Sequence, residues 1–216
     1  MDKKEQFIEL LKQTKRDGIE NLITWMEKNG FFESPCSCAF HLSKEGGLVE
    51  HSINVYNTLV ILDDALCANI PAESMLICAL LHDLGKAGDH GKHGYVPNMV
   101  KSKTKNKQTG EYDIVQSAAK PFENNKDLTY EEHEIRSLLI AERFIYISEE
   151  EETAILHHNG LYGKLDSAYG THNYDKTKLA FLLHTADMYC SRFSELEQKD
   201  EYCGLPFVDV PQSKEG

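Results

Sequence analysis

The sequence predicts an all-α fold that is interrupted by a small β-hairpin insertion around residues 94–116. Apolar residues recur at helical spacing through most of the chain. Helical periodicity disappears between residues 88 and 118, where glycine, histidine, lysine, threonine and asparagine dominate. Within that stretch, runs at 95–100 and 111–115 are typical of two short strands around a polar turn at 105–110.

The composition is that of an ordinary globular protein, with 216 residues, 41% hydrophobic residues and a formal net charge of −12. No apolar run approaches the length of a membrane span, and the first residues lack the apolar core of a signal peptide, so we expect a cytoplasmic protein. The negative charge disfavours general nucleic-acid binding but leaves room for a local basic patch. The six cysteines lack the spacing of a metal knuckle, and we expect reduced thiols.

Residues 1–45 predict packing helices and a loop that belong to the same globule as the rest of the chain. The two helices fall within residues 2–29, and each has one apolar stripe. The next helix opens at Gly46 and runs to about Leu62. Its buried stripe contains His51 where an apolar residue is expected. This indicates either a core histidine whose ring nitrogens are hydrogen-bonded or a metal ligand.

The stretch His82-Asp83-Leu84-Gly85-Lys86 follows an apolar helical run and places two polar side chains on its buried face. Burying a charged aspartate beside a histidine is unfavourable unless a partner compensates the charge. A divalent transition metal is one such partner, because imidazole nitrogen and carboxylate oxygen are both good ligands. A purely structural His-Asp pair is the alternative, and other parts of the chain decide between the two.

The helices after residue 128 carry further inward polar residues. His133 begins one helical face, and His157 and His158 end the next helix before Asn159-Gly160. One such residue is usually structural, but a whole set on inward faces is not. The final helix, which starts at about residue 175, has the inward stripe Ala180, Leu183, His184, Asp187, Cys190, Ser191 and Ser194.

His51, His82-Asp83 and Asp187 follow one another in the order H…HD…D. This order resembles the HD superfamily of metal-dependent phosphohydrolases, as do the "GGLxEHS" setting of His51 and the "HDxGK" form that ends at Lys86. The resemblance implies an HD-domain helical bundle over residues 46–200, with the metal site in its core and a tail at 201–216.

The resemblance also implies the roles of individual residues. In the binuclear members the HD aspartate, here Asp83, bridges two metals, and additional histidines complete the second site. His158 is the better match to that setting, whereas His157 is either a ligand or a supporting residue. Asp83 and Lys86 are the expected catalytic residues. The expected metal ligands are His51, His82, Asp83, His133, His157, His158 and Asp187.

This ligand set predicts hydrolysis of a phosphate ester by an activated water, with two divalent transition-metal ions chosen from Fe, Mn, Co, Ni and Zn. Lys86 would neutralise charge that develops on the phosphoryl group. The expected substrate is a small phosphate-bearing molecule such as a nucleotide, and a nucleic-acid end is a further candidate. The alternative is a catalytically silent HD module that binds a nucleotide and regulates. The sequence leaves the oligomeric state open.

A lysine-rich segment stands out in this acidic chain, because six lysines and one acid lie between Lys86 and Lys107. Lys101, Lys103 and Lys105 fall in the expected hairpin. They are either a solvated tip or part of a flap that attracts a phosphate-bearing substrate.

Overall fold

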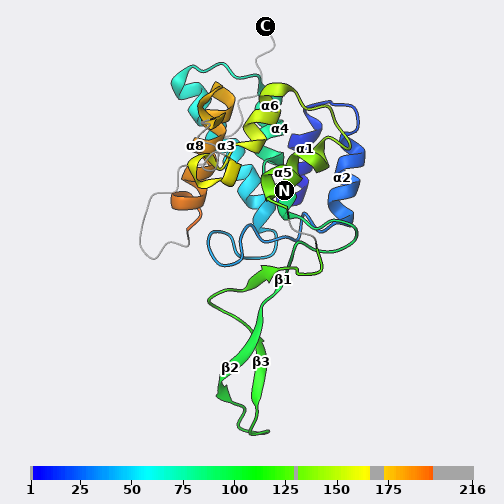
Figure 1. The fold of residues 1–216 in the computed structure, drawn as a ribbon, viewed down its shortest axis with the longest axis vertical. Coiled ribbons are helices and arrows are strands. Elements are labelled where there is room, and N and C mark those ends of the chain that lie inside the picture. The colour runs from blue at the N-terminus through cyan, green and yellow to red at the C-terminus, as the bar shows by residue number, and fades with distance from the viewer. Residues whose placement is uncertain (1, 129–130, 166–172, 197–216) are drawn as a thin grey trace.

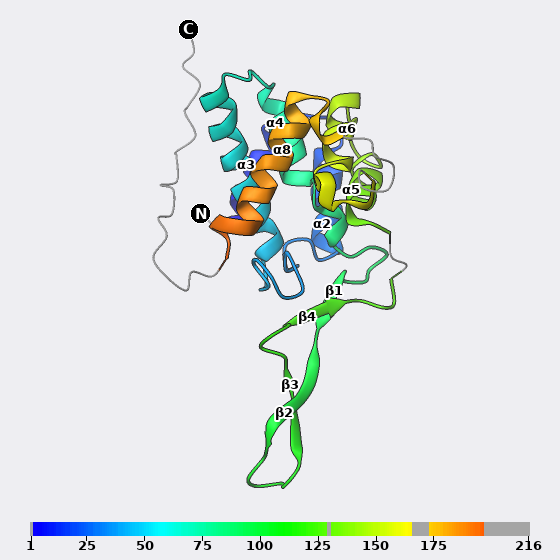
Figure 2. The ribbon, with the colours of Figure 1, turned by 60° about the vertical axis from the view of Figure 1, so that its left-hand side comes forward.

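The computed structural model describes residues 2–128, 131–165 and 173–196, which form a helical body and a protruding β arm (Figures 1 and 2). The arm consists of two small antiparallel sheets, so the protein is mixed α/β and the predicted all-α class is wrong. The expected tail at 201–216 lies outside the described residues.

The body is built around α4, which has contacts with α1, α3, α5, α6 and α8. Every residue of α4 from Met75 to Leu81 is buried, because helices surround it on all sides. The helices are α1 (Lys3–Lys12), α2 (Ile19–Lys28), α3 (Gly47–Leu66), α4 (Ala72–Leu81), α5 (His133–Ala141), α6 (Glu149–Leu156) and α8 (Lys178–Tyr189), with 3-10 turns η1 (Leu84–Lys86), η2 (Gly160–Tyr162) and η3 (Asn173–Asp175) and a π-helical turn η4 (Cys190–Ser194).

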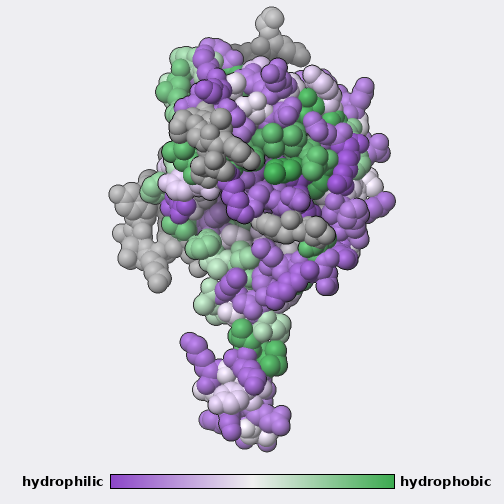
Figure 3. Space-filling view, in the orientation of Figure 1, coloured by the Kyte–Doolittle hydropathy of each residue, from purple (hydrophilic) through white to green (hydrophobic). Residues whose placement is uncertain are grey.

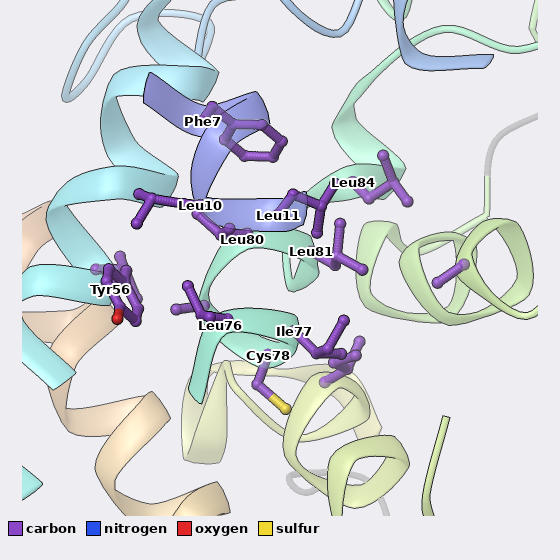
Figure 4. Close-up of a cluster of buried hydrophobic side chains, with 14 of the residues drawn as sticks. Phe7, Leu10, Leu11, Tyr56, Leu76, Ile77, Cys78, Leu80, Leu81 and Leu84 are labelled. Atoms are coloured by element: carbon purple, nitrogen blue, oxygen red, sulfur yellow. The ribbon is translucent and has the colours of Figure 1, made fainter. Parts of the chain in front are cut away.

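The two N-terminal helices belong to the same core as the rest of the body. Leu10 and Leu11 of α1 lie against Leu80 and Leu81 of α4, and Tyr56 of α3 lies nearby (Figure 4). Burying one such side chain contributes about 1.5–3 kcal/mol, so this contact holds α1 firmly on the helix that ends at the polar site.

The arm contains four strands rather than the single hairpin that the sequence predicted. Strands β1 (Tyr95–Pro97) and β4 (Phe122–Asn124) pair at its root, and β2 (Met99–Lys105) and β3 (Tyr112–Gln116) pair beyond them. The insertion therefore extends to residue 124. Strand β4 has three residues, which is too short for a period-two pattern to be recognised, and its pairing partner lies at the other end of the insertion.

Two negative findings concern the described part of the chain. None of the described helices combines the length and the apolar character needed to cross a membrane. The five described cysteines are free thiols, as the sequence predicted, and Cys203 lies outside the described residues.

Candidate metal centre

Six of the seven predicted ligands meet in the core of the body, although they come from five segments of the chain. His51 lies on α3, His82 and Asp83 directly follow α4, and Asp187 lies on α8. The remaining two are His133, at the start of α5, and His158, just after α6.

A close approach of two segments brings His133 to Asp83. Helix α4 ends at Leu81, and the chain turns through η1, which contains Gly85. A Cβ atom at Gly85 would lie 2.1 Å from the carbonyl oxygen of His133. Only glycine therefore allows η1 to pack against the first turn of α5, and this packing sets the separation between Asp83 and His133.

Each of the four imidazoles is oriented by an oxygen atom at its Nδ1. Carbonyl oxygens accept from Nδ1–H of His82 (Ala79, 2.9 Å) and of His158 (Ile155, 2.7 Å). For the His51 ring the partner is a carboxylate oxygen of Glu195 at 2.8 Å, and for the His133 ring it is a carboxylate oxygen of Glu134 at 3.2 Å. Because a carbonyl oxygen cannot donate, Nδ1 carries a proton in His82 and His158, and in the neutral form of each ring Nε2 presents a lone pair.

Four donor atoms converge on one side of the Asp83 carboxylate. The Nε2 atoms of His51 and His82 are 3.2 Å apart, and each lies 3.5 Å from Asp83 Oδ2. Asp187 Oδ1 completes the group at 3.2 Å from His51 Nε2. Donors that share one ion at about 2.0–2.2 Å are separated by roughly 3.0–3.5 Å, and the four distances just given lie in that range.

A second group faces the other oxygen of the same carboxylate. Asp83 Oδ1 lies 3.3 Å from His133 Nε2 and 3.6 Å from His158 Nε2, and these two nitrogens are 3.3 Å apart. Asp83 therefore stands between two sets of imidazole nitrogens, and each of its oxygens faces one set.

The electrostatics of the cluster suit a bound cation. Burial raises the pKa of the Asp83 carboxyl, but the Lys86 charge and the adjacent imidazoles outweigh it and hold that pKa well below the usual value. Burial lowers the pKa of His133 to about 3 and also lowers that of His82. The Asp83 carboxylate is thus ionised, and the His82 and His133 imidazoles are neutral. Burial also lowers the pKa of His51 and of His158, but neighbouring anions outweigh it and raise both above the usual value, so these two rings lose a proton when a metal binds.

One buried atom has no hydrogen-bond donor among the described residues, and it is Asp83 Oδ1. An unsatisfied buried carboxylate oxygen is costly, and a neutral imidazole whose Nδ1 carries the proton has only a lone pair to present to it. A cation satisfies the oxygen and the lone pairs at once. The buried residues His51, His82, Asp83 and His158 can therefore hold a metal ion.

The cluster is open to solvent at three of its side chains. The side chains of His51, His82, Asp83 and His158 are at most 2% exposed. In contrast, the side chains of His133, Lys86 and Asp187 are 21%, 17% and 16% exposed. A ligand can therefore approach past these three side chains.

Lys86 lies beside the cluster and contacts the Asp83 carboxylate directly. Its Nζ donates to Asp83 Oδ2 at 2.6 Å, and the thiol of Cys36 lies 3.9 Å from the same nitrogen. Burial lowers the pKa of Lys86, but the Asp83 charge outweighs it and keeps the ammonium protonated. The ion pair fixes this positive charge at the open side of the cluster.

His157 is the predicted ligand that the structure does not bring to the cluster. Helix α6 ends at Leu156, and the His157 ring turns to the outer surface, where its Nε2 lies 3.3 Å from the Asn173 side chain. It lines a surface pocket together with Glu149, Thr153 and other residues. His158, one residue further along, turns inward instead.

A glycine and a histidine support the position of His158. His184 Nδ1 donates to the His158 carbonyl oxygen at 2.7 Å. Gly160 adopts a φ of +53°, and a Cβ atom there would lie 2.5 Å from the His184 ring. Gly160 thus supplies both the left-handed turn and the space that this contact needs.

Sequence reasoning missed Glu195, which holds His51 in place. Glu195 accepts from His51 at 2.8 Å and from the Asn54 amide at 2.9 Å. We predicted that Ser194 continues the inward stripe of the last helix, but Ser194 is exposed and Glu195 is buried. The π-helical turn explains this difference, because it adds one residue and rotates Glu195 into the phase that Ser194 would have on a regular α-helix.

His41 lies beside this supporting pair, on the loop before α3. Its Nε2 is 3.2 Å from the Cys36 thiol and 4.0 Å from Glu195 Oε2. Cys36, His41 and His51 bring donor atoms near one another as well. Burial raises the pKa of the Cys36 thiol, but the charges of His51 and Lys86 outweigh it and lower that pKa to about 7.

No family model, no curated protein and no solved structure matches the chain.

Proposed function

We propose that this protein is a metal-dependent phosphohydrolase of the kind found in the HD superfamily, and that it holds two divalent transition-metal ions. The observation that carries the proposal is the Asp83 carboxylate, whose two oxygens face two separate sets of imidazole nitrogens. The order of His51, His82-Asp83 and Asp187 in the sequence, which resembles that superfamily, supports the same function.

In this proposal each ion has its own ligands and shares Asp83. His51, His82 and Asp187 would hold the first ion, and His133 and His158 would hold the second. The imidazole-rich donor set favours Fe, Mn, Co, Ni or Zn over Mg. When bound, such ions lower the pKa of water and neutralise phosphate oxygens.

The residues of the chain itself orient the substrate and hold charge. Lys86 stays protonated at the open side of the cluster, where its ammonium is within reach of a phosphate that enters past it. A fixed positive charge at that point stabilises negative charge that develops on the phosphoryl group. Glu195 and the Ala79 carbonyl hold the His51 and His82 rings, so these groups do not reorganise during the reaction.

The proposal is tested by metal analysis of the purified protein together with hydrolysis of bis(p-nitrophenyl) phosphate in the presence of Mn²⁺, Co²⁺, Fe²⁺, Ni²⁺ or Zn²⁺. We expect bound transition metal and metal-dependent release of nitrophenol. Protein that binds no transition metal under any of these conditions contradicts the proposal. Tight metal binding without hydrolysis of any phosphate ester supports the regulatory module instead.

A further inference from the structure

The outer part of the arm is a ribbon that projects from the body and has both faces exposed. Strands β2 and β3 pair Lys101 with Ile114 and Lys105 with Tyr112, so these four side chains share one face. All of them are exposed, and the Lys105 ammonium lies 5.7 Å from the centre of the Tyr112 ring. Figure 3 shows apolar side chains gathered midway along the arm and hydrophilic ones toward its tip.

The charge of this ribbon is opposite to that of the body. Residues 98–118 contain four lysines and two acids, a formal charge of +2 in a chain whose total is −12. The rest of the chain therefore has a formal charge of −14. A polyanion is repelled by the body and attracted by the arm, and this difference directs it to the ribbon.

The root of the arm adjoins the open side of the metal centre. Gly94, which precedes β1, packs so closely on η1 that a Cβ atom there would lie 2.4 Å from the Lys86 carbonyl oxygen. On the other strand, the Phe122 amide donates to the carbonyl of Cys38 at 3.2 Å. Cys38 belongs to the loop that also carries Cys36, whose thiol faces Lys86. A chain molecule that lies along the arm can therefore continue to Lys86.

We propose that the arm is a docking surface for single-stranded nucleic acid and leads a strand to the metal centre. The inference rests on the proposed function and names its substrate class. Lysines neutralise the phosphate backbone, and Tyr112 offers a ring on which an unpaired base stacks. A base in a duplex has its faces covered by its neighbours, so this platform suits a single strand.

A second copy of the chain fits the arm less well than a nucleic-acid strand does. Lysine is depleted at protein–protein interfaces, and a stable interface buries about 1,200–2,000 Å² around an apolar centre. The exposed apolar residues of the ribbon are divided between its faces: Ile114 and Tyr112 lie on one, and Val100 and Val115 on the other. Neither face has the continuous apolar centre of a dimer interface.

The test compares two variants that lose the same charge. One replaces Lys101, Lys103, Lys105 and Lys107 by Gln, and the control replaces exposed body lysines 12, 28, 44 and 176 by Gln. Fluorescence anisotropy measures binding of a labelled, phosphorothioate-linked oligo(dT) of about 20 nucleotides, which keeps its charge and resists hydrolysis. We expect the arm variant to bind at least tenfold more weakly, with a shallower salt dependence, and the control to bind like wild type.

Other results overturn the inference. The inference is wrong if wild type does not bind the oligonucleotide, or if the arm and control variants bind it equally well. It is also wrong if a duplex of the same length competes for the protein as well as the single strand does. If wild type is a dimer and the arm substitutions dissociate it, the arm binds a second copy of the chain instead. Hydrolysis of bis(p-nitrophenyl) phosphate by wild type tests the proposed function independently of oligonucleotide binding. Arm-dependent binding without hydrolysis therefore contradicts the proposed function alone, and hydrolysis without arm-dependent binding contradicts this inference alone.

Discussion

Two buried carboxylates of the body, Glu151 and Asp83, have opposite relations to their surroundings. Glu151 on α6 accepts from both terminal nitrogens of Arg16, at 2.8 and 2.7 Å, and from the Ser148 amide at 2.9 Å. Asp83 accepts from Lys86 through one oxygen, while its other oxygen faces imidazole nitrogens and has no donor among the described residues. Both side chains are almost fully buried.

Burial alone therefore does not identify a functional acid. Burial raises the pKa of Glu151, but the Arg16 hydrogen bonds outweigh it and hold that pKa below its usual value. The protein itself supplies everything that the Glu151 charge needs, so this pair connects the segment between α1 and α2 to α6 without a ligand. Asp83 is equally buried, but its Oδ1 has no such partner among the described residues, and this deficit points to a bound cation.

The largest effect is expected at Asp83. Asp83→Ala removes the carboxylate that both ligand sets share, so we expect complete loss of bound metal and of phosphate-ester hydrolysis. Metal analysis after desalting and a turnover assay measure the two losses. Asp64→Ala, at an exposed position on α3, is the matched control and should retain both. Retention of full metal content by Asp83→Ala would remove the basis of the comparison.

A large effect of a different kind is expected at Glu151. Glu151→Gln leaves the Arg16 charge without its buried partner, so we expect the free energy of unfolding to fall by about 3 kcal/mol. Bound metal should stay at the wild-type level, because Glu151 lies outside the metal cluster. Urea unfolding and metal analysis test both statements, with the exposed neighbour Glu152→Gln as control. A loss of metal in folded Glu151→Gln protein would show that the two regions are coupled.

An intermediate effect is expected at Glu195, which positions a ligand without contacting the ion in our proposal. Glu195→Gln keeps an acceptor for His51 but removes the negative charge that orients and polarises the ring. We expect metal affinity to fall about 10–100-fold, while the metal-free protein unfolds at nearly the wild-type urea concentration. A titration against a competing chelator measures the affinity, and exposed Glu45→Gln is the control. Unchanged affinity in Glu195→Gln would leave this residue a structural role only.

The smallest effect concerns acid sensitivity. Because the folded-state pKa of Glu151 lies below its ordinary value of 4.5, this group stabilises the protein above pH 4.5 and loses that contribution as pH falls through the folded-state value. Wild type should therefore lose more stability than Glu151→Gln between about pH 5.5 and pH 3.5, by about 1 kcal/mol. Urea unfolding of metal-free protein at both pH values measures the difference. Parallel losses in the two proteins would assign the acid sensitivity to other groups.

Helical periodicity was enough to predict that several side chains of the cluster face the core. His51, His82 and Asp187 interrupt apolar stripes, and a stripe on a regular helix faces the core whatever the neighbouring helices are. The same reasoning failed where the backbone departs from regular geometry. Helix α6 ends before His157 and the π turn precedes Glu195, so the helical period no longer predicts which way these two side chains point.

The sequence by itself determined that polar residues of metal-ligand type lie on inward helix faces, because the period of the α-helix acts within a few neighbouring residues. Only the tertiary structure decided that Asp83 stands between two sets of imidazoles, because that arrangement depends on the packing of η1 on α5 through Gly85. It also decided the two-sheet arm, since β1 and β4 pair across the whole insertion. Contacts of this kind join segments that are distant in the chain, and no local pattern encodes their separation in space.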